Sequence, residues 1–336
     1  MKKIPTSSPP HIATVESGYP LLAWGILLLL SLVWGSSFIL MKRGLEVFTP
    51  MEVGVLRMVL SGLCLLPFAI GQMKKIRREE WKYLLMVGVI GNGIPAILFP
   101  LAMKHVNSAT TGILNATTPL FALIIGSMAF GFAFSRQRSV GIVLGLAGTL
   151  MLILLKDEQI DFVQNFQYSL LILLATLGYG ISVNLMKKFL HRPPPLLVSA
   201  FALLSILIPY LIYMLLGTRI PTLLVEGATS TWQALGYIGI LAAIGTAWAL
   251  VVFNRLIQMT DPVFSASVTY FIPLVAIGWG LWDGELVTWR EGLGMCVILA
   301  GVFLTNRVRS GKSTKISLNT SSKLPVTPVQ EENEGQ

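Results

Sequence analysis

The residues best suited to bind a small molecule lie in one polar stretch, Asn107–Leu120, within an otherwise apolar part of the chain. A second stretch, Asp261–Leu274, begins 154 positions later and ends in the same Pro-Leu pair. Each stretch holds small polar residues and a proline just before its last residue, Pro119 or Pro273. Proline has no N–H to donate, so it breaks or kinks a helix. Two such stretches in an apolar chain are expected to line a pathway rather than to contact lipid.

The two prolines predict where polar backbone groups become available. Each removes the helical partner of the carbonyl four residues earlier, which belongs to Asn115 in one stretch and to Thr269 in the other. Such carbonyls are tolerated at membrane depth only where protein or water satisfies them. We therefore expect Asn115 and Thr269 to look across a shared cavity. The alternative is a pair of structural kinks packed against neighbouring helices.

Further polar and aromatic residues fall at comparable depth in the apolar segments. With Asn115 and Thr269 they form the expected substrate-binding set: Trp34, Ser37, Asn92, Thr118, Tyr179, Asn184, Thr246, Trp248 and Tyr270. Aromatic faces with a few amides and hydroxyls suit small amphipathic or cationic metabolites. The alternative for each aromatic residue is that it fills a helix interface. The expected hinge residues are Gly91, Pro119, Gly245 and Pro273.

Arg57 is the one clear charge inside an apolar segment. A charged residue at membrane depth is costly and is by default a functional hypothesis. Glu52 lies five residues earlier, which is poor helical spacing for a partner. Asp261 and Asp283 fall at segment ends, where a capping role is expected. The sequence therefore gives no support for a proton relay through a buried carboxylate, and a coupling proton or a counter-substrate both stay open.

The elements that must position these residues are membrane-spanning helices. Of the 336 residues, 54% are apolar and only 12% are charged, whereas soluble domains carry about 25% charged residues. Ten stretches are apolar over about the 20 residues that a bilayer-crossing helix needs: Leu21–Met41, Pro50–Gly71, Trp81–Met103, Ser108–Gly131, Val140–Leu155, Tyr168–Phe189, Leu196–Leu216, Thr231–Ile257, Pro262–Trp282 and Gly292–Asn306. The expected fold is an all-α polytopic membrane protein.

The distribution of basic residues predicts the orientation. With the N-terminus in the cytoplasm, eighteen of the 25 Lys and Arg residues fall on the cytoplasmic side and six on the other, with Arg57 inside a span. This matches the positive-inside rule and explains the net charge of +9 without a nucleic-acid-binding stripe. We expect a polar cytoplasmic tail over residues 1–20, an acidic external linker over 156–167 and a disordered cytoplasmic tail over 307–336.

Several classes of function lack their sequence signals. The two cysteines, Cys64 and Cys296, form no disulfide framework and no metal-ligand spacing. Neither a Ser-His-Asp arrangement nor a nucleotide-binding loop appears. The sequence therefore predicts no enzyme activity, no metal, no cofactor and no pump driven by ATP.

The two halves of the chain resemble each other. An offset of 145 pairs Trp34 with Tyr179 and Lys42 with Lys187, and an offset of 154 pairs Gly91 with Gly245. Because each half holds five predicted spans, an odd number, the second half must lie inverted relative to the first. Inverted repeats around a central site are common in secondary transporters. The expected repeats are residues 21–155 and 168–306, with the cavity between them.

The motifs also resemble a known family. The sequences Trp34-Gly35-Ser36-Ser37-Phe38, Met41-Lys42-Arg43-Gly44, Val55-Leu56-Arg57-Met58 and Thr117-Thr118-Pro119-Leu120-Phe121, with the Gly141 to Gly148 helix, resemble an EamA domain. The segment from about Leu170 to Thr305 resembles a second copy, although it carries Ala202 where the first has Arg57. The chain is thus similar to the drug/metabolite transporter superfamily, whose members move amino acids, amines, sugars or other small metabolites, often outward. The resemblance also allows a structural role for Arg57.

These observations together predict a secondary carrier of small metabolites such as amino acids or amines. The carrier is expected to work by alternating access and to lie in the plasma membrane. The expected partners are a small-molecule substrate and membrane lipids, and no nucleic acid. A membrane-embedded binding or scaffold protein and a passive channel are the alternatives. The substrate, the direction of transport and the oligomeric state stay open.

Overall fold

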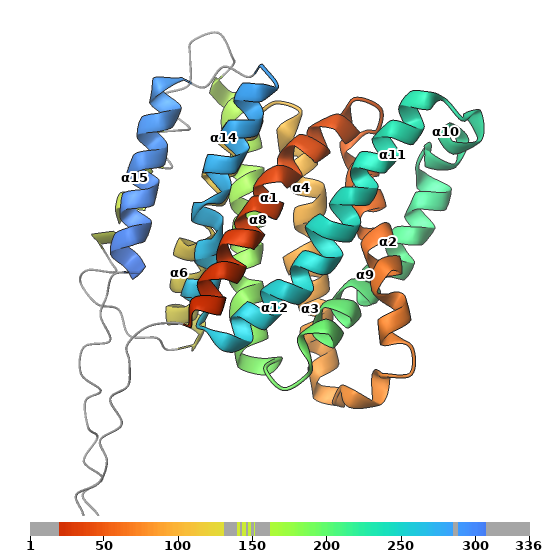
Figure 1. Ribbon diagram of the computed structural model, residues 1–336, viewed down its shortest axis with the longest axis horizontal. Helices are drawn as coiled ribbons and strands as arrows, with labels where there is room; N and C mark the ends of the chain where they lie inside the picture. Colours follow the sequence, from red (N-terminus) through yellow and green to blue (C-terminus); the bar gives the residue numbers. More distant parts are fainter. Residues whose placement is uncertain are drawn as a thin grey trace, which may run out of the picture.

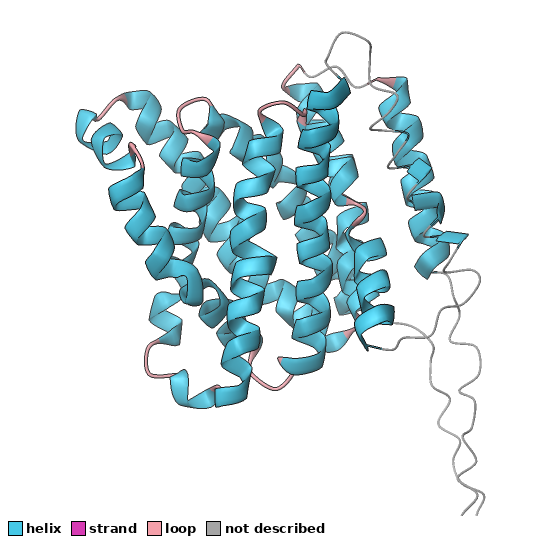
Figure 2. Ribbon diagram, turned by 180° about the vertical axis from the view of Figure 1, so that it is seen from behind, coloured by secondary structure: helices cyan, strands magenta, loops and turns pink. Residues whose placement is uncertain are grey.

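A computed structural model describes residues 20–130, 162–284 and 288–306, together with part of 140–151. The described chain is helical, with short connecting loops (Figure 2). The helices of its first half are α1 (Leu21–Leu45), α2 (Pro50–Ala69), η1 (Met73–Lys75), η2 (Arg78–Glu80), α3 (Trp81–Gly88), η3 (Val89–Gly93), α4 (Ile94–Met103), α5 (Ser108–Asn115) and α6 (Thr118–Phe130). Those that follow are α8 (Phe162–Phe189), α9 (Pro195–Gly217), α10 (Ile220–Glu226), α11 (Thr229–Ala242), η4 (Ala243–Trp248), α12 (Ala249–Met259), α13 (Pro262–Ala266), η5 (Ser267–Tyr270), α14 (Ile272–Trp282) and α15 (Trp289–Asn306).

Eight of these helical segments are long and apolar enough to cross a membrane, which confirms eight of the predicted spans. They are Leu21–Leu45, Pro50–Ala69, Arg78–Met103, Thr110–Ala129, Phe166–Phe189, Pro195–Gly217, Thr229–Met259 and Pro262–Trp282. The predicted tenth span corresponds to α15, whose apolar part is the shorter segment Gly292–Gly301. The predicted fifth span falls largely outside the described residues, as do both tails.

The predicted linker 156–167 overlaps the start of a helix. Helix α8 begins at Phe162, six residues earlier than the expected span. Three of its first six residues are polar, Gln164, Asn165 and Gln167, and a membrane helix can continue through the headgroup region beyond the roughly 30 Å apolar core. The remainder of the linker lies outside the described residues.

The two polar stretches are interrupted helices, as their prolines predict. In the first, α5 ends at Asn115 and α6 begins at Thr118. The hydroxyl of Thr118 donates to the carbonyl of Asn115 at 2.8 Å. The protein itself therefore satisfies the carbonyl that Pro119 leaves without a helical partner, so this carbonyl is not the exposed polar group that the sequence suggests.

The second polar stretch repeats the interruption with different residues. Here α13, the 3-10 turn η5 and α14 follow one another in a single span. The hydroxyl of Thr269 donates to the carbonyl of Ala266 at 3.0 Å. Both stretches also begin alike, because the side chains of Asn107 and Asp261, 154 positions apart, accept backbone N–H groups at the N-termini of α5 and α13. Such caps satisfy the first N–H groups of a helix, and they confirm Asp261 as a capping residue.

Two other spans contain π-helical segments at matched positions. Segment η3 separates α3 from α4, and η4 separates α11 from α12. Asn92 in η3 donates to the carbonyl of Val87 at 3.0 Å. Thr246 in η4 donates to the carbonyl of Leu241 at 3.1 Å. Each pair spans five residues, and the two pairs are 154 positions apart. Single π-turns within α-helices occur frequently at functional sites.

The helices pack so that each half of the chain contacts the other along most of its length. Helix α2 lies along α9, α1 packs against α11, α12 and α14, and α8 packs against α4 and α6 (Figure 1). Helix α15 lies at the edge of the bundle, where it contacts α5 and α6. Large apolar side chains face outward, among them Leu32, Phe68 and Ile212, which are more than half exposed. In a membrane this outer surface would face lipid.

Two closely packed glycines bring the halves together near the π-helical segments. A Cβ atom at Gly91 would overlap the side chain of Ser182 on α8, and one at Gly245 would lie 2.9 Å from Oγ of Ser37 on α1. Small residues allow helix backbones to approach closely in membranes. Ser37 and Ser182 are 145 positions apart, and the two glycines are 154 apart. Each half thus contributes one serine and one glycine to an equivalent contact.

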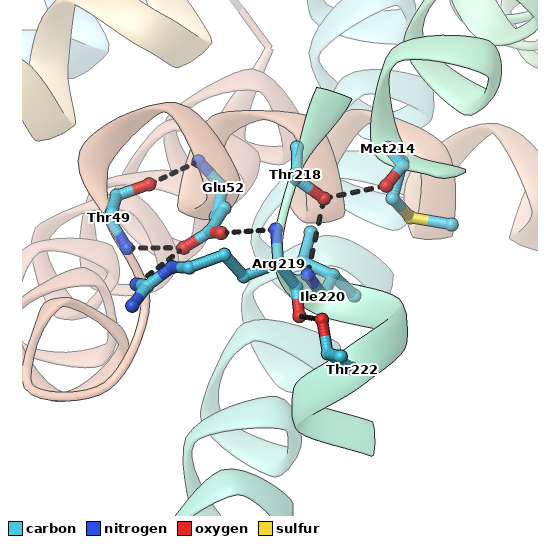
Figure 3. A network of polar contacts seen from close by, with 7 residues as sticks. All are labelled: Thr49, Glu52, Met214, Thr218, Arg219, Ile220 and Thr222. Carbon is cyan, nitrogen blue, oxygen red and sulfur yellow. Dashed lines mark hydrogen bonds and ion pairs between the residues drawn. The ribbon is translucent and has the colours of Figure 1, made fainter. Parts of the chain in front are cut away.

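One end of the bundle is held by charged and polar side chains. Lys42 and Arg43, in the last turn of α1, both pair with Asp283 after α14. At the same end, the carboxylate of Glu52 on α2 accepts the backbone N–H of Arg219, just before α10, at 2.9 Å (Figure 3). These contacts join the loops between α1 and α2, α9 and α10, and α14 and α15.

Candidate functional site

The main cavity lies in the middle of the bundle, between the two halves. Its empty space measures about 1040 Å³, which includes space open to the outside of the bundle. Helices α1, α2, α8, α9 and α12, both π-helical segments and both interrupted spans contribute to its wall. Residues of both polar stretches therefore line one cavity, as the sequence predicts.

Aromatic residues form much of the apolar wall. Phe38, Phe99 and Tyr179 follow one another, with ring centroids 6.0 Å and 5.9 Å apart. Trp34 packs edge-on against Phe253 at 5.0 Å. Such pairs prefer offset or edge-to-face arrangements, which fix the rings relative to each other. The wall is therefore rigid and suited to an apolar or aromatic part of a ligand.

The π-helical segment η4 supplies polar groups to this wall. The indole N–H of Trp34 donates to the carbonyl of Gly245 at 2.9 Å. The guanidinium Nε of Arg57 donates to the hydroxyl of Thr246 at 2.8 Å. Because a hydroxyl has only one proton, and that of Thr246 goes to Leu241, the hydroxyl acts as an acceptor toward Arg57. Thr246 thereby links the irregular helix segment to the orientation of the arginine.

Asn115 presents a buried acceptor to the cavity. Only 4% of the residue is exposed, and its Oδ1 has no hydrogen-bond partner within the described residues. Leaving a buried polar atom unpaired costs about 1–3 kcal/mol. Because Asn115 lines the cavity, a donor on a bound molecule is a suitable partner for this oxygen.

Most of the predicted substrate-binding residues come together in this cavity. Those that line it are Trp34, Ser37, Asn92, Asn115, Thr118, Tyr179, Thr246 and Thr269, together with Arg57 and the predicted hinge residues Gly91 and Gly245. Asn115 and Thr269 do share one cavity, in agreement with the placement expected from their prolines. The two prolines themselves, Pro119 and Pro273, are not part of its lining.

Three predicted residues lie elsewhere, for reasons of helical geometry. Asn184 is two positions from the lining residue Ser182, on the opposite side of α8, and its amide donates to the carbonyls of Ala122 and Gly180 at 2.8 Å each. It thus joins α8 to α6. Successive residues in a helix are about 100° apart, so residues two positions apart point in nearly opposite directions.

The same rule places Trp248. It is two positions from Thr246 and is 42% exposed on the outside of the bundle. Tyr270 ends the 3-10 turn η5, three positions before Pro273, and neither residue lines the cavity. Tyr270 packs instead against an apolar cluster that includes Ile272 and Ala276.

Sequence reasoning missed a polar pair and several methionines in the lining. The amide of Asn254 on α12 donates to the hydroxyl of Ser199 on α9 at 2.6 Å. Asn254 follows Thr246 by eight residues, or about two helical turns. Residues spaced by four lie on one face of a helix, so the position of Thr246 could have predicted that Asn254 faces the cavity. The other side chains that were missed include Met41, Met58 and Met186. The sequence gives no signal for these methionines, because a methionine that lines a cavity has the same spacing in an apolar segment as one that packs in the core.

A bundle of membrane-length helices around a central cavity with both apolar and polar walls defines a multi-pass membrane protein with an internal cavity. The model of the EamA-like transporter family matches residues 22–154 and 167–307, and the chain belongs to this family. Its members are named as transporters rather than as enzymes.

Several known proteins are similar over most of their length. An uncharacterized inner membrane transporter of Escherichia coli, YedA, is 27% identical over 84% of this chain and 89% of its own. An uncharacterized transporter of Bacillus subtilis, YdfC, is 24% identical over 81% and 87%. A probable amino-acid metabolite efflux pump of Salmonella typhimurium is 25% identical over 82% and 92%.

The fold also occurs among solved structures. One crystal structure superimposes with a TM-score of 0.62, covering 86% of this chain and 98% of the other, at 15% sequence identity. At this identity the similarity concerns the fold alone.

Proposed function

We propose that the protein is a secondary transporter of small metabolites that works by alternating access, with ten helices in two inverted five-helix repeats. One observation carries this proposal: the cavity lies between two equivalent contacts, Ser37 with Gly245 and Ser182 with Gly91. Each contact joins the first helix of one half to the π-helical segment of the other. Two contacts related in this way are expected from an inverted pair of repeats around one central site.

The interrupted segments support a mechanism of rocking. In transporters, discontinuous helices at the centre of the membrane bind substrate and allow one bundle to tilt against the other. Here η3, η4 and the breaks before Pro119 and Pro273 all lie at or beside the cavity. We infer that the closely packed Gly91 and Gly245 act as pivots while the end contacts around Glu52 and Asp283 open and close one side.

The relatives and the distribution of charge support a proposal for the location and the direction of transport. The similar protein of E. coli is named an inner membrane transporter, so we place this chain in the bacterial inner membrane, with both termini in the cytoplasm as the positive-inside rule indicates. The similar protein of Salmonella typhimurium is named an amino-acid metabolite efflux pump, so we propose export of amino acids, amines or related compounds.

Counterflow in proteoliposomes tests the proposal. The purified full chain is reconstituted with a pool of unlabelled metabolites inside, and uptake of each labelled compound is measured. A carrier accelerates uptake of a labelled substrate when the same substrate is trapped inside, and the rate saturates. A passive channel gives flux without saturation or trans-stimulation. A binding or scaffold protein retains ligand without flux, and either result would overturn the proposal.

A further inference from the structure

Arg57 is the one charged side chain among the described residues that line the cavity. Its guanidinium donates one hydrogen bond, from Nε to Thr246. The acidic side chains of neighbouring segments have other partners. The carboxylate of Glu52 accepts hydrogen bonds from the backbone N–H groups of Thr49 and Arg219, and Asp283 pairs with the end of α1. The central cavity therefore carries one positive charge that no described carboxylate neutralises.

A buried charge is stable only when it is paired or well hydrogen-bonded. The guanidinium has five N–H donors in a planar fork that matches the two oxygens of a carboxylate. One of these donors is used by Thr246, which leaves the four N–H groups of the two terminal nitrogens for a bidentate partner. Because Thr246 of η4 also donates to the carbonyl of Leu241 in α11, it holds the fork in one orientation within the cavity.

The charge is present on one side of the cavity only. The position equivalent to Arg57 at the offset of 145 is Ala202, which also lines the cavity. Asn92, the counterpart of Thr246, therefore has no cation to orient. One cation suits one anionic group, and a second carboxylate on the same ligand would have no basic partner in the lining. The remaining wall, with Phe38, Phe99 and Met58, is apolar.

We propose that the substrate carries a single carboxylate-type anionic group, which binds the guanidinium of Arg57 while an apolar body lies against the aromatic and methionine side chains. This inference rests on the proposed transport function and specifies its substrate class. It excludes simple amines and favours monocarboxylates, including zwitterionic amino acids. For a zwitterion, the buried Oδ1 of Asn115 is a suitable acceptor for the ammonium group.

Binding to the purified full chain in phosphatidylcholine nanodiscs tests this inference with matched ligands. Phenylalanine, 3-phenylpropionate, phenylalaninamide and phenethylamine share one body and differ in the carboxylate and the ammonium group. Leucine, 4-methylpentanoate, leucinamide and isoamylamine provide a second, smaller body. The inference predicts that the carboxylate-bearing members of at least one series bind and that the amide and the amine bind at least about tenfold more weakly, as expected for loss of a charged hydrogen-bonded pair.

Variants then assign the effect to Arg57. Arg57→Gln should weaken carboxylate binding by about 10- to 100-fold and leave the weak binding of the amines unchanged. Arg57→Lys, which keeps a charge but loses the fork, should give an intermediate affinity. Arg255→Gln is the matched control, because it removes an exposed arginine of α12 that does not line the cavity, and it should leave the binding of all the ligands unchanged. A purely structural role of Arg57 would lower the binding of all ligands equally and would overturn the inference.

Other outcomes separate this inference from the transport proposal. Binding of phosphate or of added phosphatidylglycerol in place of every carboxylate tested would overturn the inference, as would failure of all the carboxylates to bind. Saturable counterflow of amines that Arg57→Gln leaves unchanged would overturn it while the transport proposal stands. Carboxylate binding at Arg57 without any flux would instead overturn the transport proposal.

Discussion

Gly245 faces the hydroxyl of Ser37 so closely that a Cβ atom would lie 2.9 Å from Oγ. The matching glycine, Gly91, faces Ser182, where a Cβ atom would overlap both Oγ and Cβ of the serine. The two contacts occupy equivalent places in the two halves but differ in how much space remains. This difference leads to opposite expectations for rescue by a second substitution.

Gly245→Ala should destabilise the protein by about 1–3 kcal/mol, the usual effect of an extra methyl group in a packed interior. Ser37→Ala in the same chain should restore most of the loss, because the clash is with Oγ. Gly91→Ala should be at least as damaging, and Ser182→Ala should not rescue it, because Cβ of Ser182 is also in the way. Thermal unfolding of the four variants in detergent measures these effects. Equal rescue in both pairs would contradict the packing described.

Two asparagines that the sequence could not distinguish should respond in opposite ways to the same substitution. Asn115→Leu removes a buried oxygen without a described partner, so the unliganded protein should keep or gain stability while ligand binding falls. Asn184→Leu removes an amide that donates to two carbonyls and joins α8 to α6, and the loss of two buried hydrogen bonds should cost about 1 kcal/mol each. Melting temperatures with and without ligand decide between them, and a larger loss for Asn115→Leu would contradict its assignment to the cavity.

The sequence could predict the helices of this protein because apolar length and proline position act locally. Eight spans and the interruptions before Pro119 and Pro273 follow from these two properties. The repeat offsets also paired Asn92 with Thr246 and Gly91 with Gly245, which do occupy matched places.

The direction of side chains was harder to predict, because it depends on the exact phase of each helix. A π-helical segment inserts one residue into a turn, and a 3-10 turn tightens it. Trp248 and Tyr270 are the last residues of two such segments, η4 and η5, and neither lines the cavity. The partner of Arg57 was also not predictable, since Thr246 lies 189 positions away in the chain. Contacts between distant spans need the packing of the whole bundle.

Thr246 should matter for ligand binding in a way that Asn92 does not. Thr246→Val keeps the shape of the side chain but removes both the acceptor for Arg57 and the donor to Leu241. Asn92→Ala removes only a donor to Val87. Asn92→Ala should lower stability by about 1 kcal/mol, the typical net value of one hydrogen bond, and Thr246→Val by about twice as much because it loses two. Calorimetric titration should show weaker carboxylate binding for Thr246→Val, whereas equal affinities in the two variants would argue against an orienting role for Thr246.

The contact between Glu52 and Arg219 gives a final test, because its strength lies in the backbone rather than in the ion pair. The carboxylate of Glu52, whose side chain is 3% exposed, accepts the backbone N–H of Arg219 at 2.9 Å and that of Thr49 at 2.8 Å (Figure 3). The side chain of Arg219 is 62% exposed and lies 3.4 Å from the carboxylate. Exposed ion pairs contribute about 0–1 kcal/mol, whereas loss of a helix cap costs about 0.5–2 kcal/mol.

Glu52→Ala should therefore lower the free energy of unfolding by more than 1 kcal/mol, since it removes one half of the capping box at the start of α2 and with it the acceptor for two backbone N–H groups. Arg219→Ala should change it by less than about 1 kcal/mol, because the backbone N–H remains. High salt should reduce the effect of Arg219→Ala further and leave that of Glu52→Ala nearly unchanged. Denaturation of both variants at low and high ionic strength measures this, and similar, salt-sensitive losses would show that the ion pair provides the stability.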